Sequence, residues 1–255
     1  MTQDSETMNR PVIRRVRHEL KFRELTVTEV SHLTPHMIRV TVAGDDLDGF
    51  LSASPDDHVK VFFPREGGEP ERRDYTPRRH DAEANSLVLD FVDHEGGPAA
   101  DWARGAKVGD PLSIGGPRGS QVIEGDIAHW LLIGDETALP AIGRYIEEMG
   151  AGTKVTSLVA VPGPADEQGF DTAAELDTNW IHRPLDAATD PAPYIEALKA
   201  IELGEKTFVW IAAEAAVARA LRAYMTDQRN VPLGWLKASG YWIKGEADAS
   251  EKNIE

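Results

Sequence analysis

The amino-acid sequence changes its pattern near residue 124, and this change constrains the fold more than any other feature. Before it, short runs of β-type residues alternate with stretches rich in glycine, aspartate and proline, which predicts an antiparallel Greek-key barrel. After it, apolar strand-like runs alternate with helical patterns, which predicts a parallel sheet covered by helices. We therefore expect two domains, one at residues 10–123 and one at residues 124–255.

The same patterns predict individual elements. Asp190 and Pro191 suit a helix start, since aspartate caps a helix and proline fits its first turn, and Gly150 suits a helix end. In the first domain we expect strands at residues 37–42, 58–63, 87–92 and 111–114. In the second we expect strands at 130–133, 154–161, 180–182 and 207–211, and helices at 138–149, 190–201 and 215–227.

An arginine-rich segment, residues 73–78 with the sequence RDYTPR, concentrates the groups that a dinucleotide needs. On an extended strand alternate side chains share a face, so Arg73 and Tyr75 would act from one side. Guanidinium groups suit pyrophosphate oxygens, a tyrosine ring can stack on a planar ring, and a threonine hydroxyl can bond its edge. A flavin dinucleotide requires this set. A solvated strand end is an equally good interpretation of the segment alone, because Arg72 and Arg79 extend its charge.

A second segment favours the flavin interpretation. Residues 96–100, with the sequence GGPAA, carry no bulky side chain, so their backbone could approach a phosphate closely and offer N–H groups. Residues 101–104 then have the pattern of a short helix, whose N-terminus attracts anions. An ordinary turn before a helix would have a similar sequence. The combination with the arginine segment and with residues 116–119, GPRG, makes the ordinary turn the weaker interpretation.

Together these motifs resemble one known family, the siderophore-interacting proteins or ferric-siderophore reductases, which are ferredoxin-reductase-like flavoproteins. The resemblance implies a bound FAD, NADH or NADPH as electron donor, and a ferric siderophore as substrate. A nicotinamide delivers an electron pair whereas ferric iron takes one electron at a time, so a flavin is needed between them. The resemblance covers most of the chain, at residues 25–27, 33–40, 58–64, 73–78, 94–103, 116–120, 134–142 and 240–242.

The resemblance also implies which residues contact the cofactors. His94 by itself would be interpreted as a structural histidine. Tyr241 and Trp242 could cover the flavin, and burial in the sheet explains them equally well. In the first domain the implied residues are Arg73, Tyr75, Thr76, Arg78, Phe91, Val92, His94, Gly97, Pro98, Ala99, Trp102 and Ala103, and in the second they are Asp135, Thr137 and Ala138.

Residues 134–137, with the sequence GDET, follow the first strand of the second domain, where an open α/β sheet binds its ligand. They contain no Gly-x-Gly-x-x-Gly, and their two carboxylates repel pyrophosphate. The residues alone therefore favour a helix cap formed by Asp135 or Thr137, whereas the resemblance implies a nicotinamide site. Residues 212–215 are a second candidate, for which a plain strand-to-helix turn is the stronger interpretation.

The nucleotide preference depends on the loop after the second strand of that sheet. Residues 162–167 lack a basic side chain, which favours NADH, because a 2′-phosphate calls for an arginine there. Arg183 could reach the same region, so the choice between NADH and NADPH stays open.

A ferric siderophore is often anionic, so its site should carry positive charge. Lys60 lies on an expected strand whose valines and Phe63 share one face, while Lys60 and Phe62 share the other. A solvent-facing lysine is the default interpretation. The family resemblance implies that Lys60 contacts the substrate, which makes this interpretation as good as that of a solvent-facing lysine. Lys244 and, more weakly, Lys237 are further candidates.

Composition narrows the class of protein. The absence of cysteine excludes disulfides, thiolate metal sites and a cysteine nucleophile, and it fits a reducing compartment. No apolar run reaches membrane-spanning length, and residues 1–9 are polar and acidic, so we expect a cytoplasmic protein without a secretory signal. A net charge of −16 argues against nucleic-acid binding. We expect a monomer, no metal site, since no histidine pair has metal-ligand spacing, and no acid–base or nucleophilic residue.

Three functions are compatible with the sequence. The first is FAD-dependent reduction of a ferric siderophore by NADH or NADPH. The second is a reductase of the same fold that exchanges electrons with a ferredoxin-like protein, although the acidic composition counts against an acidic ferredoxin. The third is a siderophore-binding protein that retains flavin without turnover.

Overall fold

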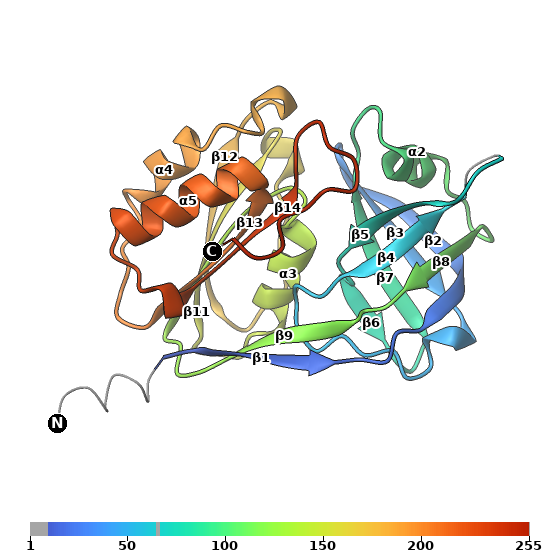
Figure 1. Ribbon diagram of the computed structural model, residues 1–255, viewed down its shortest axis with the longest axis horizontal. Coiled ribbons are helices and arrows are strands. Elements are labelled where there is room, and N and C mark those ends of the chain that lie inside the picture. Colours follow the sequence, from blue (N-terminus) through green and yellow to red (C-terminus); the bar gives the residue numbers. More distant parts are fainter. Residues whose placement is uncertain (1–9, 65–66, 255) are drawn as a thin grey trace. The chain divides into compact units, whose positions relative to one another are not determined.

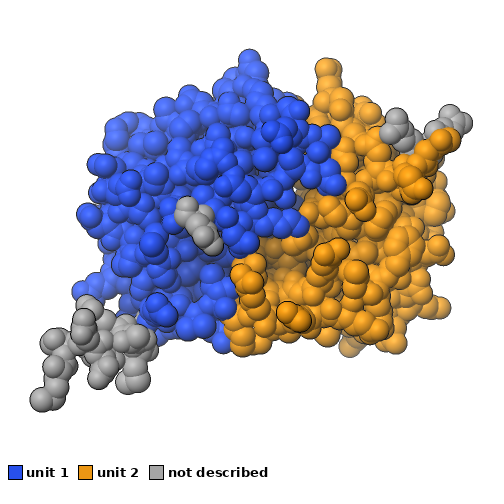
Figure 2. Space-filling model, in the orientation of Figure 1, with its two compact units in different colours: residues 1–13, 123–255 blue, residues 14–122 orange. Residues whose placement is uncertain are grey.

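The structure is a computed structural model that describes residues 10–64 and 67–254. Residues 14–122 form one compact unit, and the described residues from 123 onward form another together with residues 10–13 (Figure 2). We call them the barrel unit and the α/β unit. The expectation about a secretory signal concerns residues 1–9, which lie outside the described residues. No helix within the described ranges is long and apolar enough to cross a bilayer.

The barrel unit is built on a seven-stranded antiparallel sheet that curls into a half-barrel (Figure 1). The four strands expected from the sequence are confirmed as β3, β4, β7 and β8. The sheet has the order β5-β4-β8-β2-β3-β7-β6, with β2 (Phe22–Thr34), β3 (Met37–Ala43), β4 (Val59–Phe63), β5 (Glu71–Tyr75), β6 (Arg79–Asp81), β7 (Ser86–Val92) and β8 (Pro111–Gly115). Helix α2 (Pro98–Gly105) and the 3-10 turn η1 (Asp45–Leu47) complete the unit.

Alternation along β4 shows how the sequence builds the core of the barrel unit. Val59, Val61 and Phe63 are buried, whereas Lys60 and Phe62 are partly exposed, so the predicted division of faces is confirmed. The buried side chains join one apolar cluster with residues of β2, β3, β7 and β8. The outer face of the same strand carries the partly exposed side chains.

The α/β unit contains a five-stranded parallel sheet. The sheet has the order β12-β11-β10-β13-β14, with β10 (His129–Asp135), β11 (Lys154–Val161), β12 (Glu175–His182), β13 (Thr207–Glu214) and β14 (Leu236–Trp242). The helices are α3 (Leu139–Glu148), α4 (Ala192–Leu198) and α5 (Ala215–Asp227), and the 3-10 turns are η2 (Pro164–Asp166), η3 (Leu185–Ala187) and η4 (Leu233–Trp235). Strands β1 (Val12–Arg17) and β9 (Gly119–Glu124) pair in a separate two-stranded sheet.

Helices cover both faces of the parallel sheet, which explains why its strands are apolar on successive residues. On one face Ile133 and Ile211 pack in a cluster with Tyr194 of α4 and residues of α5. On the other face the ring of Trp130 lies 5.5 Å from the ring of Tyr145 on α3. The predicted alternation of strands and helices is confirmed, and β11 and α5 have the predicted bounds.

Several elements depart from the sequence predictions, among them β12, which begins at Glu175 rather than at residue 180. The patterns do not predict β14, because its sequence LKASGYW contains no β-branched residue. Helix α4 ends at Leu198 rather than near residue 201, since the following amides bond three residues back in a tightened last turn. Helix α2 begins at Pro98 rather than at Asp101, so part of the presumed glycine-rich loop is its first turn.

Candidate functional site

The arginine-rich segment begins on β5, at the edge of the barrel sheet. The register pairs Tyr75 with Val59 and Arg73 with Val61, and both valines are buried in the core. Arg73 and Tyr75 therefore share the inner face of β5, as the spacing predicts. Asp74 lies on the outer face, opposite Lys60. The strand thus separates the two flavin candidates from the lysine proposed for the substrate.

Arg73 and Tyr75 are held in different ways. The Arg73 side chain is 23% exposed, and its Nη2 lies 3.0 Å from Glu71 Oε2. The Tyr75 ring packs against the Phe91 ring with centroids 4.4 Å apart. Burial raises the pKa of the Tyr75 phenol above its ordinary value, although the charge of Arg73 acts in the opposite direction. The phenol is therefore neutral at physiological pH and can donate a hydrogen bond.

Arg78 lies beyond the end of β5 and is buried, as is Thr76 between the two arginines. The Arg78 Nε lies 3.9 Å from Asp90 Oδ2, and Asp90 also accepts two hydrogen bonds of 2.7 Å from Arg39. Two guanidinium groups thus share one buried carboxylate, and the three side chains sum to one positive charge. Arg73 reaches solvent and can bind a phosphate directly, whereas Arg78 contributes positive charge from beneath the surface.

The glycine-rich segment owes its shape to contacts with its neighbours. A Cβ at Gly97 would lie 2.6 Å from Cε1 of His94, so this position needs a glycine for as long as the imidazole stays there. Pro98 occupies the first turn of α2, where its missing N–H has no consequence. Arg104 joins the two ends of the segment, because it donates to Asp93 over 2.8 Å and to Asp101 over 2.7 Å.

The remaining flavin candidates lie in or against the apolar core. The Trp102 ring is 5.6 Å from the rings of both Phe63 and Phe91. Phe91, Ala99 and Ala103 are buried in the core of the barrel unit. Val92 is the last residue of β7 and is partly exposed. The fold therefore brings the ring of Tyr75 and the ring of Trp102 onto one aromatic base formed by Phe91 and Phe63.

In the α/β unit, the Asp135 carboxylate at the end of β10 is fully engaged. Asp135 Oδ1 accepts from the amide and the hydroxyl of Thr137, at 2.9 and 2.5 Å. Asp135 Oδ2 accepts from the amide of Glu214 and the indole of Trp242, both at 2.9 Å. The prediction that Asp135 or Thr137 caps the next helix is wrong, because α3 has Ala138 as its N-cap without a side-chain bond. Asp135 forms an Asx turn instead.

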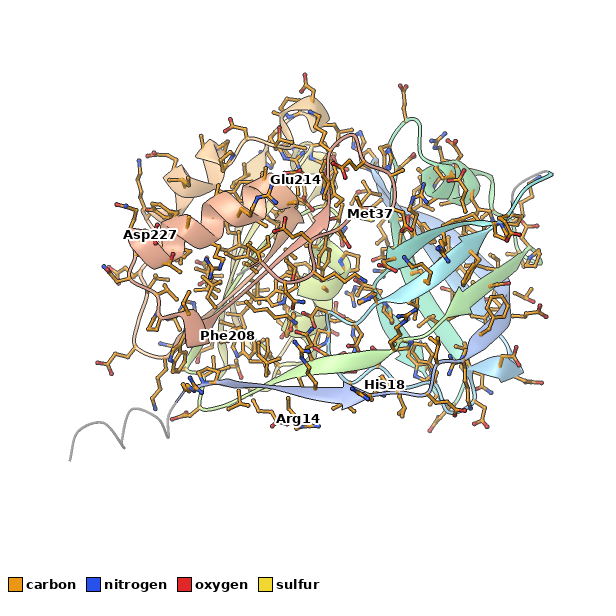
Figure 3. The ribbon with its side chains drawn as sticks, in the orientation of Figure 1. Arg14, His18, Met37, Phe208, Glu214 and Asp227 are labelled. Carbon is orange, nitrogen blue, oxygen red and sulfur yellow. The ribbon has the colours of Figure 1, made fainter. Side chains whose placement is uncertain are left out.

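The glycine and the helix N-terminus at this edge have structural explanations. A Cβ at Gly134 would lie 2.6 Å from the Cβ of Ala138 and 2.8 Å from the carbonyl of Ala212, so close packing requires the glycine. Glu214, labelled in Figure 3 where β13 meets α5, caps that helix through the amides of Ala216 and Val217 at 2.7 and 3.2 Å. The helix N-terminus already holds an anion, which supports a strand-to-helix turn at residues 212–215.

Glu136 and Arg183 form a buried ion pair that the sequence patterns do not predict. Arg183 Nη2 lies 2.7 Å from Glu136 Oε2, and the two side chains are 4% and 6% exposed. Burial and the nearby Asp135 raise the pKa of Glu136 to about 7, against the effect of Arg183. Among the described residues, Arg183 Nε and Nη1 have no hydrogen-bond partner. Glu136 follows β10 and Arg183 follows β12, which lies two strands away in the same sheet. The strand order brings the two side chains together, and a local sequence pattern does not specify it.

The three candidate substrate lysines have separate surroundings. Lys60 Nζ lies 2.9 Å from Asp74 Oδ1 on the outer face of the barrel unit. Lys244 Nζ donates to the carbonyl of Asp186 over 2.8 Å in the α/β unit. Lys237 lies near the start of β14 and Lys244 follows its end, so roughly 20 Å of strand separates them. Within the described ranges, no group of three or more histidine, aspartate or glutamate side chains could hold a metal ion.

Comparisons with known proteins cover both units. The family model described as "Siderophore-interacting protein" matches residues 127–245, and the model described as "Siderophore-interacting FAD-binding domain" matches residues 26–72 and 66–121. The chain is 34% identical to the NADPH-dependent ferric-chelate reductase of Escherichia coli over an alignment of 253 residues, and the match covers 89% of this chain and 95% of that protein. It is 29% identical to the ferric vibriobactin reductase of Vibrio cholerae over 256 residues, covering 91% and 94% of the two chains.

A solved structure agrees with these sequence matches. The crystal structure of a siderophore utilization protein from T. fusca superposes with a TM-score of 0.86 at 33% identity. The superposition covers 94% of this chain and 98% of that one.

Proposed function

The chain belongs to the family of siderophore-interacting proteins, and from this premise we propose that it binds FAD and reduces the iron of a ferric siderophore with electrons from NADPH or NADH. The observation that carries the proposal is the Arg73–Tyr75 motif of β5, which lies within the second matched segment of the FAD-binding domain. The name of the Escherichia coli relative supports NADPH as the donor, and the names of both curated relatives support a ferric chelate as the substrate.

The barrel unit offers the donor set that FAD requires. The partly exposed Arg73 guanidinium, oriented by Glu71, suits a pyrophosphate oxygen. Tyr75 and Trp102 present rings supported by Phe91, and the Tyr75 phenol is neutral and can donate. We propose that the same site also includes Thr76, Arg78, Phe91, Val92, His94, Gly97, Pro98, Ala99 and Ala103. When bound, FAD accepts an electron pair as hydride and can release its electrons one at a time.

We assign nicotinamide binding to the α/β unit, at the carboxyl end of β10. Thr137 and Ala138 lie there, after the strand and before α3, where open parallel sheets bind their ligands. Asp135 is a positioning residue in this assignment, because its carboxylate already accepts bonds from Thr137, Glu214 and Trp242. Its contribution is to hold the Thr137 turn in place.

The substrate assignment rests on positive charge. We propose that Lys60 contacts the ferric siderophore, and that Lys244 and Lys237 are weaker candidates whose separation along β14 prevents both from binding one small ligand directly. We propose that the protein is a monomer in the cytoplasm, and a chain without cysteine fits a reducing compartment. A ferredoxin-like electron donor is the second enzyme hypothesis, and the net charge of −16 counts against an acidic partner of this kind.

An anaerobic visible spectrum of the purified protein tests the proposal. NADH, then NADPH, then a ferric siderophore would be added in turn. We expect a flavin spectrum that bleaches with a nucleotide and returns when the iron complex is added. A flavin spectrum that neither nucleotide changes would favour a protein electron donor or a siderophore-binding protein without turnover. A colourless protein that cannot take up added FAD would contradict the proposed function.

A further inference from the structure

The buried row of β2 begins with an arginine rather than with an apolar side chain. Buried and exposed residues alternate along this strand, and Arg23 comes before Leu25 and Val27 in the buried row. Arg23 is only 3% exposed. Within the described ranges its guanidinium group forms no salt bridge. Buried charges are normally paired, so this cation needs an explanation.

Backbone carbonyls hold the Arg23 guanidinium in one orientation. Its Nε donates to the carbonyl of Asp46 over 3.0 Å, and its Nη1 donates to the carbonyls of Gly116 and Lys21 over 2.9 and 3.4 Å. The group also lies over the ring of Phe50, 5.1 Å from its centroid. In the part of the chain that the structure describes, Nη2 donates no hydrogen bond. The N–H donors of this nitrogen are therefore available on a fixed group.

The charge of Arg23 is only partly compensated. Burial lowers the pKa of Arg23 from its ordinary value, while the carboxylates of Asp46 and Glu19 act in the opposite direction. The Asp46 carboxylate accepts a hydrogen bond from the amide of Glu24 over 2.9 Å. The Glu19 carboxylate, whose side chain is 82% exposed, lies 3.7 Å from Lys21 Nζ. The guanidinium group stays protonated at physiological pH, so a further anion beside it is favourable.

A pocket of about 120 Å³ opens beside Arg23. Lys21, Glu19, His18 and the turn at residues 116–117 also line it. With His18 neutral, the lining carries one net positive charge, in a chain whose net charge is −16. A water molecule needs about 10–15 Å³ of such space, so the pocket has room for a small oxyanion and several waters.

Hydrogen bonds between neighbouring elements fix the walls of the pocket. The imidazole Nε2 of His18, labelled in Figure 3, lies 2.7 Å from Ser120 Oγ, and this hydroxyl donates to the buried Asp57 carboxylate over 2.6 Å. The amide of Gly116 donates to the carbonyl of Lys21 over 3.0 Å. The pocket is thus formed before a ligand arrives, which lowers the cost of binding.

We propose that this pocket binds a tetrahedral oxyanion of the phosphate class. The oxygens of the ligand accept hydrogen bonds from Arg23 Nη2 and from the Lys21 ammonium, which exchanges Glu19 for the ligand. The exchange costs little, because exposed ion pairs contribute little to stability. A planar carboxylate prefers two guanidinium nitrogens side by side, and the carbonyls already occupy Nε and Nη1. A tetrahedral anion can use Nη2 alone.

Calorimetric titration of the FAD-loaded protein with inorganic phosphate tests this inference. Bound FAD occupies the phosphate-binding groups that we propose for the flavin, and sodium chloride keeps the ionic strength constant. The variants are Lys21→Ala and Arg23→Lys. The control is Lys107→Ala, which removes an exposed lysine of the same unit that does not line the pocket. Lys21→Ala and the control change the net charge equally, so a local contact is what distinguishes them.

We expect wild type and Lys107→Ala to bind phosphate with the same Kd, Lys21→Ala about threefold more weakly and Arg23→Lys about tenfold more weakly, since charged donors bind phosphate strongly. Leu51 lines the pocket and is 62% exposed, so Leu51→Glu adds a carboxylate there without disturbing the core and should abolish binding. This variant keeps the test decisive if Arg23→Lys does not fold. An unchanged Kd in Lys21→Ala and Leu51→Glu would overturn the inference.

Two further probes identify the source of the phosphate group. Glycerol phosphate represents a soluble monoester, and phosphatidylcholine vesicles that contain phosphatidic acid represent a lipid headgroup. A probe whose binding is weakened by Lys21→Ala and not by Lys107→Ala supports the inference and identifies that source. A wild-type protein that binds none of the three probes would overturn it. The proposed reductase function is tested separately, because phosphate binding at this pocket without reduction of a ferric chelate contradicts that function alone.

Discussion

The indole Nε1 of Trp242 donates a hydrogen bond to Asp135 Oδ2 over 2.9 Å, and this bond joins the ends of two strands that are not neighbours in the sheet. Strand β13 lies between β10 and β14, and its last residue, Glu214, donates its amide to the same oxygen. One buried carboxylate thus connects the carboxyl ends of three parallel strands. The turn proposed for nicotinamide binding is consequently held by the sheet itself.

Replacing Asp135 should therefore affect stability before it affects binding. Asp135→Ala leaves the donors of Thr137, Glu214 and Trp242 without their acceptor, and we expect the free energy of unfolding to fall by about 3 kcal/mol or more. Trp242→Phe removes one of these bonds and should cost about 1 kcal/mol. Urea titrations followed by fluorescence measure both. Unchanged stability together with slower reduction by NADPH would mean that Asp135 acts on the nucleotide directly.

The two faces of β5 allow a matched test of the flavin site. Arg73→Ala removes the inner guanidinium, and we expect FAD affinity to fall at least tenfold while the fold is retained, because charge-assisted bonds to phosphate are among the strong ones. Arg72→Ala, on the outer face of the same strand, should leave FAD affinity unchanged. Absorbance near 450 nm after dialysis reports the flavin content. Full occupancy in the Arg73 variant would remove this residue from the site.

Gly134, the residue before the last one of β10, should be needed for packing rather than for phosphate contact. In Gly134→Ala the new methyl group would meet Ala138 at 2.6 Å and the Ala212 carbonyl at 2.8 Å, so we expect a loss of about 1–3 kcal/mol. Gly163→Ala places its methyl group in open space and should stay within about 0.5 kcal/mol. Thermal unfolding compares the two variants, and a stable Gly134→Ala would contradict the packing explanation.

The pH dependence of stability should reveal the buried pair of Glu136 and Arg183. The folded protein raises the pKa of Glu136 from 4.5 to about 7, so the folded state holds this proton more tightly than the unfolded chain. The resulting stabilisation is complete below about pH 4.5 and is lost as the pH rises through about 7.

We therefore expect the free energy of unfolding of the α/β unit to decrease over that range, and Glu136→Gln to flatten the decrease. Tryptophan fluorescence isolates the unit, since five of the six tryptophans lie in it and only Trp102 belongs to the barrel unit. The same slope in wild type and variant would show that Glu136 stays ionised in the folded protein.

Local patterns were sufficient to predict much of the fold and the shared strand face of two candidate site residues. The bounds of β11 and α5 match the periodicity of their residues, because burial on two sheet faces or one helix face imposes a regular spacing. The spacing of Arg73 and Tyr75 likewise places both on one face of β5. Strand β14 was not predicted, because its residues LKASGYW have little local preference for a strand. They are extended because they pair with β13.

The sequence by itself determined two units of different sheet type and the resemblance to a family, and it predicted a flavin-binding role for residues 73–78. Only the tertiary structure decided that Arg78 shares Asp90 with Arg39 while Arg73 reaches solvent, and that Asp135 serves strand ends up to 107 residues away. The physical reason is the distance along the sequence over which each kind of interaction acts. Periodicity and turn chemistry depend on neighbours within a few residues, whereas the partner of a buried charge depends on strand order and register, which a local pattern does not specify.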